Sequence, residues 1–415
     1  MRALLTLLGL LPACLWSATT AADLAARIRQ TGLDPEQCYR IREINFARED
    51  IRLYLTDGYL VFGREVNGRR ISAVFSGHNE GGDAELLLMP PLRSERLSLA
   101  TFTHSPNLNE HFRLALMLFT DGTAEELLRL IQARTNVQKS PETGILLERQ
   151  FSSAVNNLAG SFGMRFLHEL LSGNPPSEGF FYAAIRGNRL GNFDLVYDPA
   201  AQEQIQVGQV NFRDNRAYFD VWTSFPARAF RTGSKRFESA IAPLTDYRIE
   251  ATLAADVHLK ATTRARISTT KRPQPVLDFE ISDRMNVTTV LLDGQPCEVF
   301  QREALRDNLL RGHGNKLFLV VPPQPLQPGQ DYDIEFRHDG RVVAEAGNGV
   351  YYVGARGSWY PRRGLHFTDY DVTFRYPASL DLVFPGETVE ARTEAEWRTT
   401  RRRSESPIRL FGFNV

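Results

Sequence analysis

The amino-acid sequence predicts a mainly β protein with two domains. Apolar and polar residues alternate along many short segments, Asp-Gly and Asn-Gly pairs separate several of them, and helical periodicity is confined to two stretches. The chain has 415 residues, of which 42% are hydrophobic and 24% charged, an ordinary globular composition with room for more than one core. Lys+Arg and Asp+Glu balance at 49 each, which argues against a nucleic-acid partner.

The first 22 residues have the pattern of a secretory signal peptide. Arg2 is followed by an apolar run over Ala3–Leu11, and Thr20-Ala21-Ala22 offers small residues for cleavage. The run is too short to cross a bilayer as a helix, so the mature chain is expected to be exported to the periplasm or outside the cell and not to be transmembrane. Leu11-Pro12-Ala13-Cys14 is also similar to a bacterial lipobox, and in that alternative Cys14 would carry a lipid anchor.

A β-meander with two helices is predicted for the N-terminal domain, residues 23–230. Apolar residues alternate with polar ones over 51–56, ahead of Asp57-Gly58, and the pattern resumes after Asn67-Gly68. Such dipeptides favour two-residue hairpin turns because both residues tolerate positive φ. Further strands are predicted at 180–185, 193–197, 204–212 and 218–225.

The two helices are predicted near residues 124–134 and 153–171. Thr123 and Glu126 have the spacing of a capping box at the start of the first helix. The second has an apolar stripe at helical spacing and ends before Gly173, a residue suited to a helix C-terminus.

Residues 231–244 are predicted to link the domains, because basic residues occur there with little periodicity. Alternation resumes over residues 245–415, for example in Tyr247–Leu253 and Leu259–Ile267. One apolar and one polar face per strand is typical of an antiparallel β-sandwich. Asp293-Gly294 and Asp339-Gly340 predict two more hairpin turns.

Several stretches of the second domain carry a family resemblance. They are DYRIEATLAADVHLKATTRARI, VTTVLLDGQPCEVF, KLFLVVPPQPLQPGQDYDIEFRHDG, WYPRRGLHFTDYDVTFRYPASLDLVFPGE and the closing PIRLFGFNV. Together they resemble the N-terminal β domain of the aminopeptidase-N-like (gluzincin) zinc metallopeptidases. The resemblance covers residues 245–415 and implies a β-sandwich that precedes a catalytic domain in that family.

The zinc-binding motif of that family is missing from this chain. The family's chemistry needs H-E-x-x-H on a helix, so that two imidazoles face one metal ion. The His-Glu pair here, His168-Glu169, continues Leu170-Leu171-Ser172 and has a serine where the second histidine is required. No catalytic residue and no metal ligand is therefore assigned, and zinc is expected only if another chain supplies a catalytic domain.

Three histidines and one acidic loop are candidates for metal ligands. His168 is interpreted as a helix-surface residue, and His104 and His111 as loop residues because Pro106 lies between them. Asn79, Glu80, Asp83 and Glu85 form a Gly-rich acidic loop that could hold Ca²⁺ or simply be a solvated hairpin loop, and the second interpretation is favoured.

Two further charged groups are interpreted as ordinary surface. Asp331, Asp333 and Glu335 alternate with apolar residues, which predicts the solvated side of a strand rather than acid–base catalysts. Arg398 and Arg401–Arg403 are interpreted as a charged turn between the last two strands, with an anionic partner or lipid surface as the alternative.

An aromatic segment near the C-terminus is either part of the core or a docking surface. Core packing is favoured, and the docking alternative rests on the family domain packing there against its catalytic neighbour. The candidate partner surface comprises Tyr352, Trp359, Tyr360, Arg362, Arg363 and Phe367.

Two cysteines follow Cys14 in the sequence, Cys38 and Cys297. They fall in different predicted domains, so two buried thiols are favoured over a disulfide, which an oxidising compartment would permit.

Two functions are consistent with these features. The first is an exported, non-catalytic binding or scaffold protein whose partner is a peptidase catalytic domain or another protein. The second is the front half of a zinc metallo-aminopeptidase whose H-E-x-x-H domain lies outside this chain. An unpaired sheet edge after the last strand would favour a partner in either case.

Overall fold

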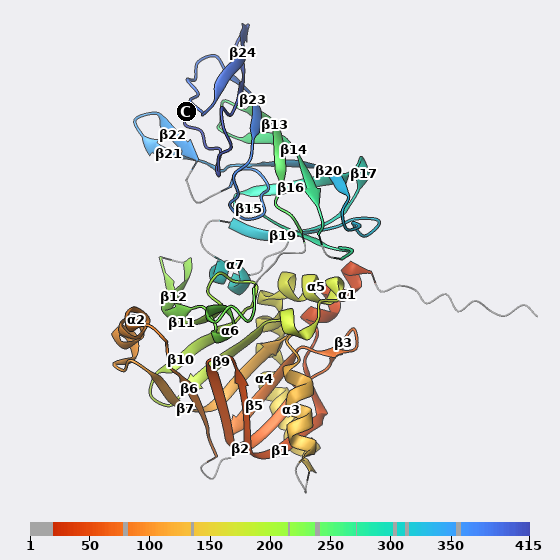
Figure 1. Cartoon of the computed structure of the whole chain (residues 1–415), viewed down its shortest axis with the longest axis vertical. Coiled ribbons are helices and arrows are strands. Elements are labelled where there is room, and N and C mark those ends of the chain that lie inside the picture. Colours follow the sequence, from red (N-terminus) through yellow and green to blue (C-terminus); the bar gives the residue numbers. More distant parts are fainter. Residues whose placement is uncertain are drawn as a thin grey trace, which may run out of the picture.

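The computed structural model confirms a mainly β fold. It describes residues 20–77, 82–133, 137–214, 216–236, 241–270, 272–301, 305–311, 315–353 and 358–415. The N-terminal and C-terminal halves of the chain form two β-rich bodies that follow one another along the long axis (Figure 1). Most of the predicted signal peptide, with Cys14, and Asn79 and Glu80 of the acidic loop lie outside the described residues.

The first body contains a ten-stranded antiparallel sheet with the order β12-β11-β10-β9-β7-β5-β2-β1-β8, in which β6 pairs with β2 and β7. Half of the neighbouring pairs in this order are consecutive in sequence, so β9–β12 and β1–β2 form the meander that was predicted, whereas β5, β7 and β8 pair with strands more distant in the chain. The strands are β1 (Leu33–Arg48), β2 (Ile51–Gly63), β5 (Ser72–Gly77), β6 (Ala84–Leu88), β7 (Leu108–Phe119), β8 (Gln138–Lys139), β9 (Phe181–Gly187), β10 (Gly191–Tyr197), β11 (Ile205–Arg213) and β12 (Arg216–Phe225).

Helices cover both faces of this sheet. Because side chains alternate across a strand, Leu60 and Phe62 of β2 join a core with α2 and α3, while Val61 joins one with α4 on the other face. Helices α1 and α5 lie on that second face, against Tyr182 and Val196. The helices are α1 (Ala21–Arg29), α2 (Arg93–Thr103), α3 (Thr123–Gln132), α4 (Pro141–Ser161), α5 (Gly163–Ser172), α6 (Arg228–Arg231) and α7 (Leu305–Arg311).

The helices differ from the prediction in number and extent. The helix predicted at 153–171 is two helices, α4 and α5, which meet at Phe162 beside two flexible glycines. Its predicted end is right, since Gly173 follows α5 with a φ of 59°. Helices α1, α2, α6 and α7 were not predicted from the sequence, and the first two residues of α1 fall within the predicted signal peptide. In the structure Thr20 caps α1 by accepting a hydrogen bond from the Asp23 amide at 3.1 Å.

The second body is built around an eight-stranded sheet with the order β17-β16-β20-β14-β13-β23-β25-β24. Strands β13 and β23 are parallel, and the other neighbours are antiparallel. The strands are β13 (Thr245–Leu253), β14 (Leu259–Ser268), β16 (Met285–Leu292), β17 (Gln295–Pro296), β20 (Asp331–Gly340), β23 (Tyr370–Pro377), β24 (Glu387–Glu394) and β25 (Trp397–Arg403).

A small sheet lies between this large sheet and the first body. It has the order β15-β19-β18, with β15 (Leu277–Ser282), β18 (Glu298–Phe300) and β19 (Asn315–Val321). Phe279 and Phe318 point from one face of it into the sandwich core. Leu317 and Leu319 point from the other face into a core shared with α1 and α5. The small sheet is therefore a middle layer that is buried on both sides and joins the two bodies.

Two of the four predicted hairpin turns are right. Asn67 and Gly68 have positive φ between the short strands β3 (Glu65–Val66) and β4 (Arg69–Arg70). Asp293-Gly294 likewise connects β16 and β17. The other two predictions are wrong, because Asp57-Gly58 lies within β2 and Asp339-Gly340 within β20. A side chain at Gly58 would meet the ring of Phe75, so this glycine allows close approach rather than a turn.

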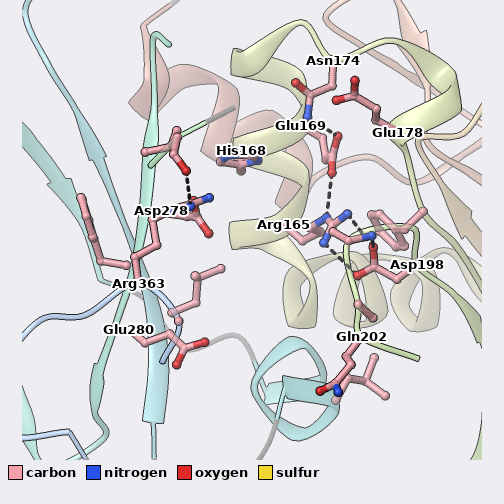
Figure 2. A pocket seen from close by; sticks show the side chains of 18 of the residues that line it. Arg165, His168, Glu169, Asn174, Glu178, Asp198, Gln202, Asp278, Glu280 and Arg363 are labelled. Carbon is pink, nitrogen blue, oxygen red and sulfur yellow. Dashed lines mark hydrogen bonds and ion pairs between the residues drawn. The ribbon is translucent and has the colours of Figure 1, made fainter. Parts of the chain in front are cut away.

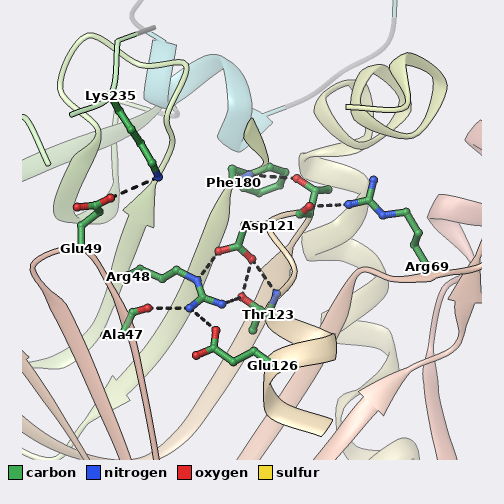
Figure 3. A network of polar contacts seen from close by, with 10 residues as sticks. Ala47, Arg48, Glu49, Arg69, Asp121, Thr123, Glu126, Phe180 and Lys235 are labelled. Carbon is green, nitrogen blue, oxygen red and sulfur yellow. Dashed lines mark hydrogen bonds and ion pairs between the residues drawn. The ribbon is translucent and has the colours of Figure 1, made fainter. Parts of the chain in front are cut away.

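The basic stretch after β12 contacts the turn between β1 and β2. Arg231 binds Asp50 through two contacts of 2.9 and 3.1 Å. Lys235 lies 3.5 Å from Glu49, as Figure 3 shows. Residues 237–240 of the predicted linker lie outside the described residues. Within the described ranges, no helix combines the length and apolar character that crossing a bilayer requires.

The cysteines are free thiols in the structure. Cys38 lies in β1, buried against α4, and Cys297 is half-buried beside β17 in the other body. Burial raises the pKa of Cys38 to about 12 and that of Cys297 to about 11, so both are protonated at neutral pH. The favoured expectation of two separate thiols agrees with this arrangement, although Cys297 is less buried than expected.

Candidate functional site

A large cavity lies where the two bodies meet. Its volume is about 920 Å³, and its walls are α5 and the β10–β11 loop of the first body and β15 and residues 362–366 of the second (Figure 2). Cavities at domain interfaces are preferred places for ligand sites, and known sites commonly measure about 300–1,000 Å³.

Arg165 is the central charged group of the α5 wall. It is 5% exposed, and its guanidinium makes two hydrogen bonds to Asp198, of 2.9 and 3.0 Å. Its Nε also lies 2.8 Å from Glu169 Oε1, one helical turn away, and its guanidinium stacks over the ring of Phe180 at 5.3 Å. One buried guanidinium therefore pairs with two carboxylates.

A second set of contacts connects the two bodies across the cavity. Asn174, after α5, donates a 3.2 Å hydrogen bond to Glu169. Arg272 of the second body donates to Asn174 Oδ1 and to Glu178 Oε2, both at 2.6 Å. The polar network of the cavity thus includes side chains from both bodies.

Strand β15 provides the opposite wall because of its alternation. Leu277, Phe279 and Ile281 point into the sandwich core, so Asp278 and Glu280 point to the cavity side. Figure 2 shows both carboxylates on this wall, facing α5 and the β10–β11 loop.

Two arginines of the aromatic segment accompany these carboxylates. Arg363 donates to Asp278 Oδ1 at 3.0 Å and to the carbonyl of Ile241 at 2.9 Å. Arg362 exchanges backbone hydrogen bonds of 2.8 and 2.9 Å with Glu280, while its Nε lies 3.8 Å from the Glu280 carboxylate, beyond hydrogen-bond length. These two members of the predicted partner surface therefore line the interdomain cavity.

His168 was expected on the solvated surface of a helix, and this expectation is wrong. Its side chain lines the interdomain cavity. It extends from α5 toward Asp278 (Figure 2). Burial lowers its pKa, and the nearby carboxylates of Asp278 and Glu169 oppose this shift only in part. The imidazole is therefore neutral at neutral pH.

The other candidate ligands do not assemble into a metal site. Among the residues that the structure describes, no three His, Cys, Asp or Glu side chains are grouped so as to hold a metal ion. His104 follows α2 in a left-handed conformation, whereas His111 lies in β7, where a loop was expected. His111 Nδ1 lies 2.8 Å from Asp83 of the acidic loop, and Glu85 belongs to β6.

Trp359 and Tyr360 belong to the core and not to a partner surface. They are 1% and 2% exposed, and Trp359 donates a 2.7 Å hydrogen bond from its indole to the carbonyl of Phe411. The residues at the end of the chain cover Trp359 and Tyr360. Local sequence patterns cannot reveal this burial. The docking alternative is wrong for these two residues, whereas Tyr352 and Phe367 are 42% and 63% exposed.

An apolar groove of about 420 Å³ lies beside this aromatic core, near the C-terminus. Val383, Leu410 and Phe413 contribute to its lining, and Val383 is 65% exposed. It is a second place at which a partner could bind.

The basic cluster lies in β25 and not in a turn. Arg401 makes two hydrogen bonds to Asp371, of 2.8 and 2.6 Å, and Arg403 adds a third to the same carboxylate at 3.1 Å. Arg398 pairs with Asp381 at 2.9 Å. Across the same sheet, Asp331, Asp333 and Glu335 lie in β20 on the side that alternation predicted, and Glu335 pairs with Arg264 at 2.8 Å.

A second buried charge cluster stabilises the first body (Figure 3). Arg48, at the end of β1, donates to Glu126 Oε2 and to Thr123 Oγ1, both at 2.7 Å, and also to Asp121. The capping box predicted for Thr123 and Glu126 is therefore wrong, because both side chains bind Arg48 and Gly122 precedes α3 instead. This cluster joins β1 to α3 and to the loop before it, and none of its four side chains is part of the cavity lining.

Comparison with known proteins gives a limited likeness. No protein-family model and no curated protein matches the chain. A solved M1 zinc metallopeptidase from Deinococcus radiodurans matches 43% of this chain and 42% of its own, at 15% identity and a TM-score of 0.35. A mutant two-domain M1 zinc metallopeptidase bound to L-arginine matches the same shares at 14% identity and a TM-score of 0.34.

The resemblance to the aminopeptidase-N-like zinc metallopeptidases is thus found in the structure comparison as well as in the sequence. The match spans about 42% of the length of those solved structures. At this identity and TM-score the likeness carries no argument about activity, substrate or partner. The candidate site is therefore defined by its own side chains.

Proposed function

We propose that this chain is an exported, non-catalytic binding or scaffold protein whose ligand occupies the interdomain cavity. The observation that carries this proposal is the cavity of about 920 Å³ into which charged side chains from both bodies point. Buried charges are costly unless they are paired, so such a lining favours recognition of a polar ligand over packing alone.

Export is part of the same proposal. It rests on the pattern of residues 1–22, which favours a periplasmic or extracellular protein. Fractionation of expressing cells, with the mass of the mature chain, tests it. A full-length mass in the cytoplasm would contradict export, and an added lipid mass would support the Cys14 anchor.

The alternative is that this chain is the front half of a zinc metallo-aminopeptidase. The apolar groove near Val383 and Leu410 supports it, because a catalytic domain in another chain would cover such a surface. Zinc would then come with that domain. The partner would be a peptidase domain and not a nucleic acid.

Measurements on the purified full-length chain separate the two functions. The binding proposal predicts no stoichiometric zinc, no aminopeptidase activity, and saturable binding of a small polar ligand by calorimetry. Zinc at one equivalent together with peptide hydrolysis would overturn it. Activity that appears only when a separate H-E-x-x-H chain is added would support the alternative.

A further inference from the structure

We propose that the interdomain cavity binds an aliphatic ammonium group, carried either by a free diamine or by a lysine side chain of a peptide. This inference rests on the proposed function, because it specifies the ligand class for the same cavity.

The lining of the cavity carries an excess of negative charge. Four guanidiniums contribute to the cavity, from Arg165, Arg272, Arg362 and Arg363. Six carboxylates face them, from Glu169, Glu178, Asp198, Glu203, Asp278 and Glu280. His168 is neutral at neutral pH and does not offset the difference. The carboxylates outnumber the cations even when His366, the second histidine of the lining, is counted as positive. A cavity with excess negative charge and low-dielectric walls attracts cations.

Most of the guanidiniums are already engaged. Arg165 binds Asp198 and Glu169, Arg272 binds Glu178 and Asn174, and Arg363 binds Asp278 and a backbone carbonyl. An incoming anion would have to replace these contacts. Arg362 is the exception, since among the described residues its guanidinium comes no closer than 3.8 Å to a carboxylate, that of Glu280. An anionic probe is therefore the sharpest competitor for the test.

The carboxylates with least compensation lie on opposite walls. Glu203, on the β10–β11 loop, accepts a hydrogen bond from the Ser224 hydroxyl. Glu280, on β15, lies 3.8 Å from the nearest guanidinium nitrogen. Figure 2 shows Glu280 across the cavity from Gln202, the neighbour of Glu203. A ligand with a cationic end between these walls would gain charge-assisted hydrogen bonds.

Apolar side chains in the same lining account for the aliphatic part of the ligand. Phe162, Phe180, Leu310 and Leu317 all border the cavity. Methylene groups packed against them would leave water while the ammonium group keeps polar partners. A small hydrated metal cation would not use this surface.

Calorimetric titration of the full-length chain with matched probes tests the inference. The probes are 1,5-diaminopentane, a blocked Ala-Lys-Ala peptide, neutral 1,5-pentanediol and anionic glutarate. We expect the diamine or the lysyl peptide to bind, and the difference between them identifies the source of the ammonium group. Glu280→Gln and Glu203→Gln should each weaken that binding about tenfold, the usual effect of losing one charged hydrogen-bond partner.

Glu298→Gln is the matched control, because Glu298 is exposed on β18 outside the cavity lining. It should leave the affinity unchanged, and denaturation curves of all three variants should match the parent chain. Binding of pentanediol or glutarate in preference to both amines would overturn the inference and leave the binding function standing. Absence of binding of all four probes to the folded chain would count against both.

Discussion

His338 lies inside the C-terminal sandwich, on β20, and is 1% exposed. Its Nε2 lies 2.9 Å from the Thr263 hydroxyl on the neighbouring strand β14. Burial lowers the pKa of His338 to about 3, so the folded protein holds the imidazole neutral.

The first prediction concerns acid stability. The unfolded chain takes up a proton at His338 below about pH 6.5, whereas the folded chain does so only near pH 3, so this residue's contribution is complete above pH 6.5 and declines as the pH falls. His338→Gln cannot titrate. The unfolding free energy of this variant minus that of the parent chain should rise by about 1.4 kcal/mol for each unit by which the pH falls within this window. Urea denaturation at pH 7, 5 and 4 measures this difference. A difference that stays the same at all three pH values would contradict the prediction.

The second prediction concerns Arg165. Arg165→Met leaves Glu169 and Asp198 without their cation in a buried site, which should cost about 3–5 kcal/mol. Arg64→Met is the matched control, because Arg64 pairs with Glu148 at the surface, where such pairs contribute about 1 kcal/mol or less. Urea denaturation of both variants measures the difference, and equal losses would show that the cavity network is not buried as described.

At the level of the elements, two Asx-Gly pairs show how one dipeptide serves two purposes. Asn67-Gly68 forms a turn because both residues adopt positive φ, whereas Asp57-Gly58 continues through β2 with the ring of Phe75 against the glycine. Sequence pattern alone could not separate them, because the deciding contact comes from a neighbouring strand.

The third prediction follows from this difference. Gly68→Ala meets no neighbouring atom but keeps a positive φ, so it should cost about 1 kcal/mol. Gly58→Ala places a methyl group against Phe75 and the Ser76 carbonyl in the middle of the sheet, so a larger loss of about 1–3 kcal/mol is expected. Thermal unfolding of the two variants gives the order, and a milder effect at Gly58 would contradict it.

For the whole molecule, the shared middle layer leads to the fourth prediction. Removing the first body would expose Leu317 and Leu319 on the small sheet. Arg306 of α7 would also lose its contacts with Tyr182 and Asp194, of 2.6 and 2.8 Å. The full chain should therefore unfold in one calorimetric transition. A chain limited to residues 241–415 should bind a hydrophobic dye and melt at a lower temperature. Two separate transitions in the full chain would show independent bodies.

The sequence predicted the β fold well, because the predicted strands at 180–185, 193–197, 204–212 and 218–225 lie close to β9, β10, β11 and β12. It predicted little of the candidate site. The sequence pattern suggested other roles for His168, Arg362 and Arg363, and it suggested no role for Asp198 or Asp278. Alternation shows that Asp278 points away from its own core, and Arg165 within an apolar helix stripe signals a buried partner. What those side chains meet depends on the packing of distant segments, which local patterns do not contain.

The double-sided burial of the small sheet has a consequence for ligand entry. Two bodies joined through a common interior cannot swing apart without separating apolar side chains, so the recess between them is already shaped before anything enters. Ligand binding should therefore occur without closure of the two domains. X-ray scattering of the free and the ligand-bound protein should give the same radius of gyration.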